Sequence, residues 1–389
     1  MAHNRILNGT HEVSSVVGQC YNIVMQNLSN ATKLIAKIVD GKNLTATESE
    51  KVFKDVFLYD TAGFHLTALI AAIHAKGETE EELLGFVRAH EKLGNYIKVD
   101  IPIDQITDLA GSGGGAFKSF NISTTASFVV AGAGYTVVKE AFFAVTSPTG
   151  SADVFAELGM NVFEISASDI KHTLETVGIC CGYYPAISPR LKNRGVLNKK
   201  ILMEHKLQIR TPYHIASNVL SPVKMNRRIY GCYDEKYLPI LAKLFAKLKF
   251  KHTLVFTGLD GFPEISTVGK TKVIEQKGNT FKEFTLVPSD LGLKKAQLKD
   301  IQTGGREQNM IDFLRIIHGI EKGSKRDIVL ANASVSFYVM RKVKDFKEGT
   351  ALARKIIESG KAKEKLENLV NEIGDKKKYH NWLKRAGLG

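Results

Sequence analysis

The hydrophobic pattern of the chain changes near residue 100, and this change constrains the fold more than any other feature. From Ser29 to Leu93 the apolar residues recur at the spacing of amphipathic helices. Beyond that point, short β-branched or apolar runs alternate with glycine-rich turns and helical patterns. Repeated strand, turn and helix predict a mainly parallel sheet covered by helices. We therefore expect an α/β protein in which a small all-helical domain is joined to a larger α/β domain.

Charge is the feature of the composition that bears on function. The 389 residues carry a formal net charge of +14 and a pI near 9.4. Such an excess attracts phosphate, either on a small ligand or along a nucleic acid. The N-terminus lacks the apolar core of a signal peptide, and no apolar run is long enough to span a bilayer. We expect a cytoplasmic protein that does not enter a membrane.

A glycine-rich segment, Gly111–Gly115, lies between the short apolar run Ile106–Leu109 and a helical pattern that extends to about Ala133. Glycines let the backbone approach a phosphate closely and direct several N–H groups at it. Ser123 or Thr124 would cap the helix and add a hydroxyl and a positive helix end to the same anion. The spacing predicts a phosphate-binding site.

Two further side chains fit this chemistry. Lys139 closes the strand that is expected at Tyr135–Val138 and could meet the same anion. Glu264 follows the buried run Leu254–Thr257, and a carboxylate at the end of a parallel strand is suited to a magnesium ion that bridges substrate phosphates. A solvated lysine and an ordinary turn acid remain the alternatives.

Basic residues gather in two places, the segment Ser188–Arg210 and the tail Asp375–Gly389, which also holds the only tryptophan, Trp382. Each is either a phosphate-binding or nucleic-acid-binding surface or a solvated face, and the tryptophan either stacks on bases or docks on the protein itself. The residues proposed for nucleic acid are Arg190, Lys192, Arg194, Lys199 and Lys200.

Four segments together resemble a known family. Gly111–Thr124 reads G-S-G-G-G-A-F-K-S-F-N-I-S-T, Val145–Asp153 reads V-T-S-P-T-G-S-A-D, Leu207–Thr211 reads L-Q-I-R-T and Arg326–Ala333 reads R-D-I-V-L-A-N-A. They resemble the motifs of anthranilate phosphoribosyltransferase and, more distantly, of the class II nucleoside phosphorylases that share its fold. The resemblance covers about residues 32 to 373.

The resemblance implies a homodimer formed through helical domains, with the active site at the hinge between the helical and α/β domains. The domain limits that it implies are residues 1–31 for an N-terminal extension, 32–102 and 185–212 for the helical domain, 103–184 and 213–373 for the phosphoribosyl-binding α/β domain, and 374–389 for a basic tail.

The resemblance also implies a reaction in which an aromatic amine attacks phosphoribosyl pyrophosphate, with magnesium as cofactor. Another phosphorylated sugar is the alternative to phosphoribosyl pyrophosphate. Ser123 and Glu264 would serve the metal. The residues that it assigns to phosphoribosyl pyrophosphate are Gly111, Ser112, Gly113, Gly114, Asn121, Ser123, Thr124, Lys139 and Thr146.

The chain departs from the family at the loop and metal positions and at the expected acceptor pocket. Gly115 and Pro263 replace family aspartates, Glu140 stands in a K-E-A-F segment where the family has K-H-G-N, and Glu204 aligns with the arginine that receives the anthranilate carboxylate. Replacing that arginine by Glu204 turns an attraction into a repulsion, each about 4 kcal/mol at about 4 Å with an effective dielectric of about 20. We expect Glu140 and Glu204 to disfavour anthranilate.

Three functions are consistent with these residues. The first is a phosphoribosyltransferase whose acceptor is a neutral or cationic nitrogen base rather than anthranilate. The second is a non-catalytic homologue that binds nucleic acid through its basic segments. The third is anthranilate phosphoribosyltransferase itself, the enzyme of tryptophan biosynthesis. We rank them in this order from the residue chemistry.

Overall fold

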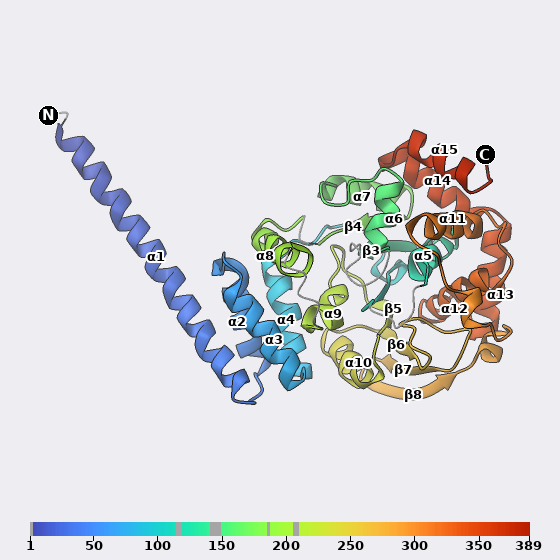
Figure 1. The fold of residues 1–389 in the computed structure, drawn as a ribbon, viewed down its shortest axis with the longest axis horizontal. Coiled ribbons are helices and arrows are strands. Elements are labelled where there is room, and N and C mark those ends of the chain that lie inside the picture. Colours follow the sequence, from blue (N-terminus) through green and yellow to red (C-terminus); the bar gives the residue numbers. More distant parts are fainter. Residues whose placement is uncertain (1–2, 114–118, 141–148, 185–186, 205–209) are drawn as a thin grey trace. The chain divides into compact units, whose positions relative to one another are not determined.

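The structure is a computed structural model that describes residues 3–113, 119–140, 149–184, 187–204 and 210–389. The chain forms two compact units (Figure 1). The helical unit comprises Met1–Leu93 and Arg190–Pro212, and the α/β unit comprises Gly94–Pro189 and Tyr213–Gly389. A helical domain and an α/β domain are therefore both present, as the hydrophobic pattern predicts.

The helical unit begins with a single long helix, α1, and the part expected as an N-terminal extension belongs to this helix. The helices of the unit are α1 (His3–Val39), α2 (Ala46–Tyr59), α3 (Phe64–Lys76), α4 (Glu80–Leu93) and α8 (Lys192–Asn198), followed by a π-helical turn at Lys199–Glu204. Among the described helices of the chain, α1 included, none carries an apolar stretch suited to crossing a bilayer.

The start of α2 shows how local sequence sets a helix end. The Thr45 side chain accepts a hydrogen bond from the Glu48 backbone N–H, and the Glu48 carboxylate accepts one from the Thr45 N–H. This reciprocal capping satisfies donors that the first turn of a helix otherwise leaves unpaired. Behind it, Phe53, Phe57 and Phe86 pack edge-on or tilted against one another in the core.

The α/β unit holds two sheets. Strands β1 (Ile106–Thr107), β3 (Thr136–Glu140) and β4 (Ile179–Gly182) pair in parallel in the order β1-β3-β4. Strands β2 (Leu109–Gly111), β5 (Arg227–Gly231) and β6 (His252–Gly258) are also parallel, and β7 (Thr271–Lys277) and β8 (Thr280–Leu286) extend that sheet in antiparallel fashion. The described strands thus form mainly parallel sheets, as predicted.

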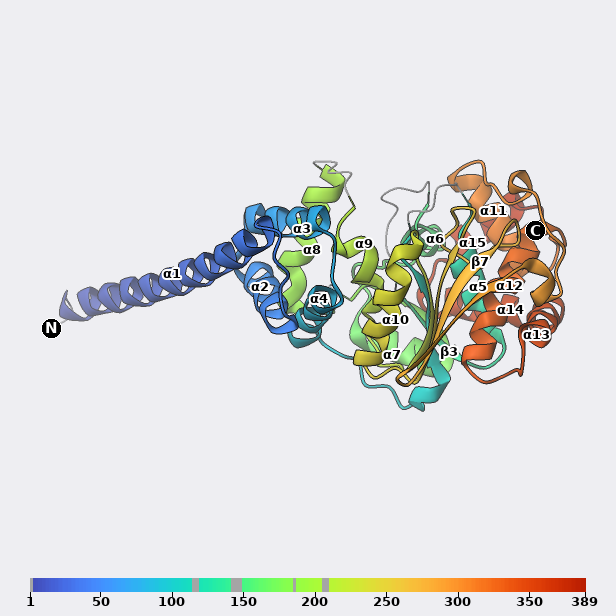
Figure 2. The same cartoon turned by 90° about the horizontal axis from the view of Figure 1, so that it is seen from below.

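Helices cover both faces of the larger sheet. Figure 2 shows α10 (Leu238–Lys247) on one face of the strands, and α5 (Ile122–Gly132) and α12 (Ser324–Val339) on the other. The remaining helices of the unit are α6 (Ser151–Glu157), α7 (Ala167–Thr176), α9 (Pro212–Ala216), α11 (Arg306–Ile317), α13 (Phe346–Glu358), α14 (Lys361–Ile373) and α15 (Lys376–Arg385). Because both faces are covered, β6 is buried along its whole length.

The helical unit ends earlier than the resemblance implies, at Leu93 rather than at residue 102, and its second segment starts at Arg190 rather than at residue 185. The reason lies in the packing of the segment that follows Leu93. Ile97 joins the cluster formed by Ile106, Val138 and other apolar residues of the α/β unit, and its backbone N–H donates to the Pro222 carbonyl at 2.8 Å.

The basic tail folds back on its own unit. Trp382 in α15 is 7% exposed, and its indole N–H donates to the Glu157 carboxylate on α6 at 3.1 Å. The Arg385 guanidinium lies 4.1 Å from the centre of the Trp382 ring and pairs with Glu307. Of the two interpretations of the tail, the structure supports docking, because a buried tryptophan does not offer its face to a base.

A charge cluster joins β6 to β7, with His252 and Glu275 buried and Lys277 exposed. The Glu275 carboxylate lies 2.8 Å from the His252 ring nitrogen Nε2 and 2.7 Å from Lys277 Nζ. Burial by itself raises the pKa of Glu275, but hydrogen bonds with His252, Lys277 and Tyr338 outweigh burial and lower this pKa to about 2. The folded state therefore favours the ionised carboxylate.

We expect this cluster to contribute acid-dependent stability. Since the pKa of Glu275 is lower in the folded than in the unfolded chain, its contribution is complete above about pH 4.5 and is lost as the pH falls towards 2. Glu275→Gln should lower the free energy of unfolding at neutral pH by roughly 1–3 kcal/mol and flatten its acid dependence. Chemical denaturation between about pH 2 and 7 measures both effects. Glu283→Gln, at an exposed position on β8, is the control, and an equal loss in both variants would refute the prediction.

Candidate active site

The glycine-rich loop starts where β2 ends and is fastened to the end of β5. Ser112 donates its backbone N–H to the Gly231 carbonyl at 2.8 Å, and its hydroxyl accepts a hydrogen bond from the Tyr233 N–H at 2.9 Å. Gly113 has a φ of +62°, a conformation that favours glycine. The site residues Gly111, Ser112 and Gly113 are thus held at the carboxyl end of a parallel sheet, whereas Gly114 and Thr146 lie outside the described residues.

Gly231 also brings the turn that carries Glu264 against this loop. A Cβ atom on Gly231 would lie 1.8 Å from the Pro263 carbonyl oxygen, so no larger residue fits there. Through Gly231, the loop on one side and the Pro263–Glu264 turn on the other become neighbours. Residues from three distant parts of the sequence therefore meet at the ends of β2, β5 and β6, where ligands commonly bind in open parallel sheets.

Helix α5 begins just after the glycine loop, but it is not capped as predicted. The helix starts at Ile122 with Asn121 as its N-cap, and Asn121 makes no side-chain cap. Ser123 and Thr124 are the second and third residues of the helix, so neither of them is the cap. Because no side chain caps the helix, the backbone N–H groups of its first turn, at the positive end of the helix dipole, are available to an anion.

Lys139 belongs to a buried group of charges. Asp108, which follows β1, is fully buried and lies 3.7 Å from Lys139 Nζ and 3.1 Å from an Arg228 guanidinium nitrogen. Arg228 also donates to the carbonyl oxygens of Asn218 and Val219. Lys139 is 4% exposed. One carboxylate thus faces two basic side chains, which leaves a surplus of positive charge. This charge lies next to the glycine loop, because Asn218, which accepts from Arg228, also donates its side-chain amide to the Gly111 carbonyl.

A cation could be held at the other side of the loop. Asp260 Oδ1 and Glu264 Oε2 are buried atoms without a hydrogen-bond partner in the described structure. Burial and, to a smaller extent, the neighbouring Asp260 charge raise the pKa of Glu264 to about 8. Carboxylate oxygens are the ligands that magnesium prefers. The two carboxylates therefore fit the magnesium ion that was expected at Glu264, and Asp260 is a second candidate ligand. Within the described ranges, no group of three or more acidic, histidine or cysteine side chains gathers around a common point.

Glu140, which the sequence places in the acceptor pocket, makes a hydrogen bond within the α/β unit. Its carboxylate accepts a hydrogen bond from the Tyr184 backbone N–H at 3.0 Å and its side chain is 2% exposed. Glu140 pairs in register with Gly182 across β3 and β4. The residue therefore holds the end of β4 close to β3.

The basic segment of the helical unit is divided between exposed and buried side chains. Arg190, Lys192 and Lys200 are exposed, but Arg194 is 1% exposed, so it does not belong to a surface that binds nucleic acid. The side chain of Lys199 lies outside the described part. Glu204 is exposed at the end of the π-helical turn.

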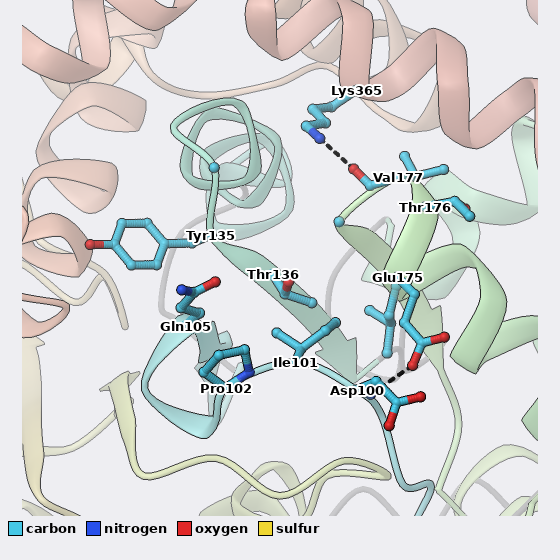
Figure 3. Close-up of a pocket in the computed structure, with 13 residues that line it drawn as sticks. Asp100, Ile101, Pro102, Gln105, Tyr135, Thr136, Glu175, Thr176, Val177 and Lys365 are labelled. Carbon is cyan, nitrogen blue, oxygen red and sulfur yellow. Dashed lines mark hydrogen bonds between the residues drawn. The ribbon is translucent and has the colours of Figure 1, made fainter.

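A surface pocket of about 290 Å³ lies at the opposite ends of the strands (Figure 3). Its lining includes Tyr135 and Thr136 at the start of β3 and Val177 just before β4, and Lys365 donates to the Val177 carbonyl there. Lys139 and Glu140 lie at the other end of β3. The pocket is therefore separate from the glycine loop.

Sequence reasoning missed the side chains that support the site. Asp108 interrupts the run Ile106–Leu109, and Arg228 directly precedes the apolar pair Ile229–Tyr230; a charge this close to buried strand residues was the available signal. Asp260 was visible only as an ordinary turn acid, because nothing in the sequence shows that one of its oxygens is buried and unpaired.

Comparison with known proteins identifies the class. Residues 103–363 match the family described as "Glycosyl transferase family, a/b domain", and residues 32–93 match "Glycosyl transferase family, helical bundle domain". A glycine-rich loop at the carboxyl ends of parallel strands and a chain of one helical and one α/β unit agree with that class. The protein is therefore a glycosyltransferase.

The relatives narrow this class. An anthranilate phosphoribosyltransferase of Haloarcula marismortui is 34% identical over 86% of this chain and 98% of its own length, and one of Methanococcoides burtonii is 35% identical over 86% and 92%. The crystal structure of anthranilate phosphoribosyltransferase from Thermus thermophilus superposes with a TM-score of 0.78 at 26% identity, over 87% of this chain and 99% of that one. The chain belongs to the anthranilate phosphoribosyltransferase family.

The raised pKa of Glu264 predicts a stability cost that a metal relieves. Because this pKa is higher in the folded than in the unfolded chain, stability should fall as the pH rises from about 4.5 to about 8. Glu264→Gln should melt several degrees above wild type near pH 8.5 and at the same temperature near pH 4.5. Magnesium should raise the melting temperature of wild type near pH 8.5 but not that of the variant.

Thermal denaturation across this pH range measures the difference between the two proteins. Glu358→Gln, at an exposed position on α13, is the control and should follow wild type throughout. A wild-type stability that does not change between these pH values, or an equal response of both proteins to magnesium, would contradict the assignment.

Proposed function

We propose that the chain transfers the phosphoribosyl group of phosphoribosyl pyrophosphate to an aromatic amine, with anthranilate as the acceptor. The observation that carries the proposal is the buried group of Lys139, Asp108 and Arg228 beside the glycine loop. Two buried cations with one carboxylate between them leave one unit of positive charge. A buried surplus charge of this kind is stabilised by a bound anion, such as the diphosphate of the sugar donor.

The chemistry then follows from the charges. The amine nitrogen attacks the anomeric carbon, the bond from that carbon to the diphosphate oxygen breaks, the diphosphate leaves with the electron pair, and the amine loses a proton. Negative charge grows on the leaving diphosphate as this bond lengthens. Lys139 and the N–H groups at the start of α5 would stabilise this growing charge, and groups that are already held in place lower the barrier without having to reorganise.

Glu264 and Asp260 would hold the magnesium ion, with Ser123 as the third ligand that the resemblance assigns. The structure of a Saccharomyces cerevisiae relative is described as a complex with phosphoribosyl pyrophosphate and magnesium. When bound, the ion would neutralise charge on the diphosphate. The buried and unpaired oxygens of Asp260 and Glu264 support this assignment.

The names of the relatives support anthranilate as the acceptor, and they do so over nearly the full length of those chains. This proposal puts first the function that the residue chemistry ranks third. The carboxylate of Glu140, one of the two acids expected in the acceptor pocket, accepts a hydrogen bond from the Tyr184 backbone, so this residue has a structural role.

Lys139→Met should raise the Kd for phosphoribosyl pyrophosphate by about tenfold or more, since a buried charge-assisted contact contributes roughly 1.5–3 kcal/mol. Calorimetric titration in the presence of magnesium measures this constant. The matched control is Lys365→Met, at the opposite end of the strands, which should bind as wild type does. If both variants bind the donor as wild type does, Lys139 has no part in holding it.

A second prediction concerns the acceptor. If Glu204 lies where the family has its arginine, the KM for anthranilate should fall in the order Glu204, Glu204→Gln, Glu204→Arg. The whole change should be several-fold, because water weakens the field of an exposed carboxylate. Formation of phosphoribosyl-anthranilate under steady-state conditions gives these constants. Identical constants in the series would remove Glu204 from the acceptor pocket.

Glu204 also favours a second candidate, transfer to a neutral or cationic nitrogen base. Release of pyrophosphate with a panel of amines separates the two candidates. Turnover with such a base and none with anthranilate would establish the second candidate, and the reverse result would establish the first.

A further inference from the structure

Asn309 in the first turns of α11 is fully buried and contacts the start of α5. Its carbonyl oxygen accepts a hydrogen bond from the Asn121 backbone N–H at 2.7 Å, although 188 positions separate the two residues. Because a backbone N–H can only donate, this contact determines the orientation of the Asn309 amide. Its NH₂ group therefore faces away from Asn121 N–H and needs another acceptor.

The two segments meet at a second point, which makes the contact part of a continuous arrangement. Ser119 forms an isolated antiparallel bridge with Gln302. The chain that enters α5 and the chain that enters α11 thus lie side by side. Asn309 is held by this pairing against the N-terminus of α5.

Three buried polar groups at this helix end have no hydrogen-bond partner in the described structure: Asn309 Nδ2, Asn121 Nδ2 and Thr124 Oγ1. Both amide nitrogens are donors, and the hydroxyl can donate. Buried polar groups in native proteins are nearly always paired, so a cluster of unpaired donors calls for an acceptor that binds there. Asn309 and Thr124 are each 0% exposed.

The charges on α11 do not oppose an anion at this end. Its acids are Glu307 and Asp312, and each is paired with a cation, Glu307 with Arg385 and Asp312 with Lys325. Arg306, at the first position of α11, pairs with Glu157 on α6. The donors at the start of α5 therefore face no unpaired carboxylate from the helix that carries Asn309.

We propose that Asn309 binds the phosphoribosyl donor directly and positions Asn121 for the same task. Its carbonyl oxygen holds the Asn121 backbone, and its amide NH₂ donates to an oxygen of the phosphorylated sugar. This inference rests on the proposed function, since it assigns a further residue to the same site.

The substitution that tests the proposal is Asn309→Asp. The aspartate keeps an oxygen for the Asn121 N–H but replaces the NH₂ donor by a carboxylate oxygen that repels an anion. The matched control is Gln276→Glu on β7. Gln276 is also 0% exposed, but its amide is fully used within the protein, since it donates to the Phe250 and Gly278 carbonyls and accepts from Thr253.

Calorimetry with phosphoribosyl pyrophosphate and magnesium, without acceptor, gives the Kd of each protein, and steady-state kinetics gives both KM values. Asn309→Asp should raise the Kd and the KM for the sugar donor about tenfold or more and leave the acceptor KM unchanged. Gln276→Glu should lower the melting temperature and leave the Kd within about twofold of wild type.

An Asn309→Asp protein that loses stability as Gln276→Glu does but binds the donor like wild type would overturn the inference and leave the proposed function intact. A wild-type chain that does not bind the donor would overturn both. Should Asn309→Asp not fold, Asn309→Ser decides the matter: weakened donor binding at an unchanged acceptor KM supports the inference, and unchanged donor binding refutes it.

Discussion

The pairing of one buried carboxylate with two basic side chains organises the end of the α/β unit that carries the glycine loop. Asp108 lies between β1 and β2, Lys139 is on β3, and Arg228 is on β5, so the group connects the two sheets of the α/β unit. Removing charges from water is costly unless each finds a partner. Here one carboxylate lies between two basic side chains and compensates only one of them, which leaves a site suited to an anion.

The same end of the molecule contains groups that reduce stability in the absence of a ligand. Unpaired donors at the start of α5 and unpaired carboxylate oxygens on Asp260 and Glu264 are buried on either side of the glycine loop. Each has a desolvation cost of roughly 1–3 kcal/mol when nothing binds it. Native proteins tolerate such groups mainly where they serve function, because the groups are then oriented before the ligand arrives.

The limits of sequence reasoning can be seen at particular residues. The pattern of Gly111–Thr124 predicts a glycine loop followed by a helix, and α5 is that helix, but the cap assigned to Ser123 or Thr124 was wrong, since α5 begins at Ile122. Phosphate binding by the loop stays a prediction. Helix ends depend on the direction in which the chain enters, and that direction is set by contacts with Asn309 far along the sequence. The exclusion of anthranilate, argued from Glu204, stays a prediction, and the relatives favour the opposite choice.

The order of helices and strands, the positive charge and the glycine loop were determined by the sequence itself, because each depends on neighbouring residues or on composition. The helical limit at Leu93, the burial of Arg194 and Trp382, and the partners of Lys139 and Asn121 were decided only by the tertiary structure. Those partners come from segments far apart in the chain. Their charges and hydrogen-bonding groups act on one another only after folding has brought them together and removed the water between them.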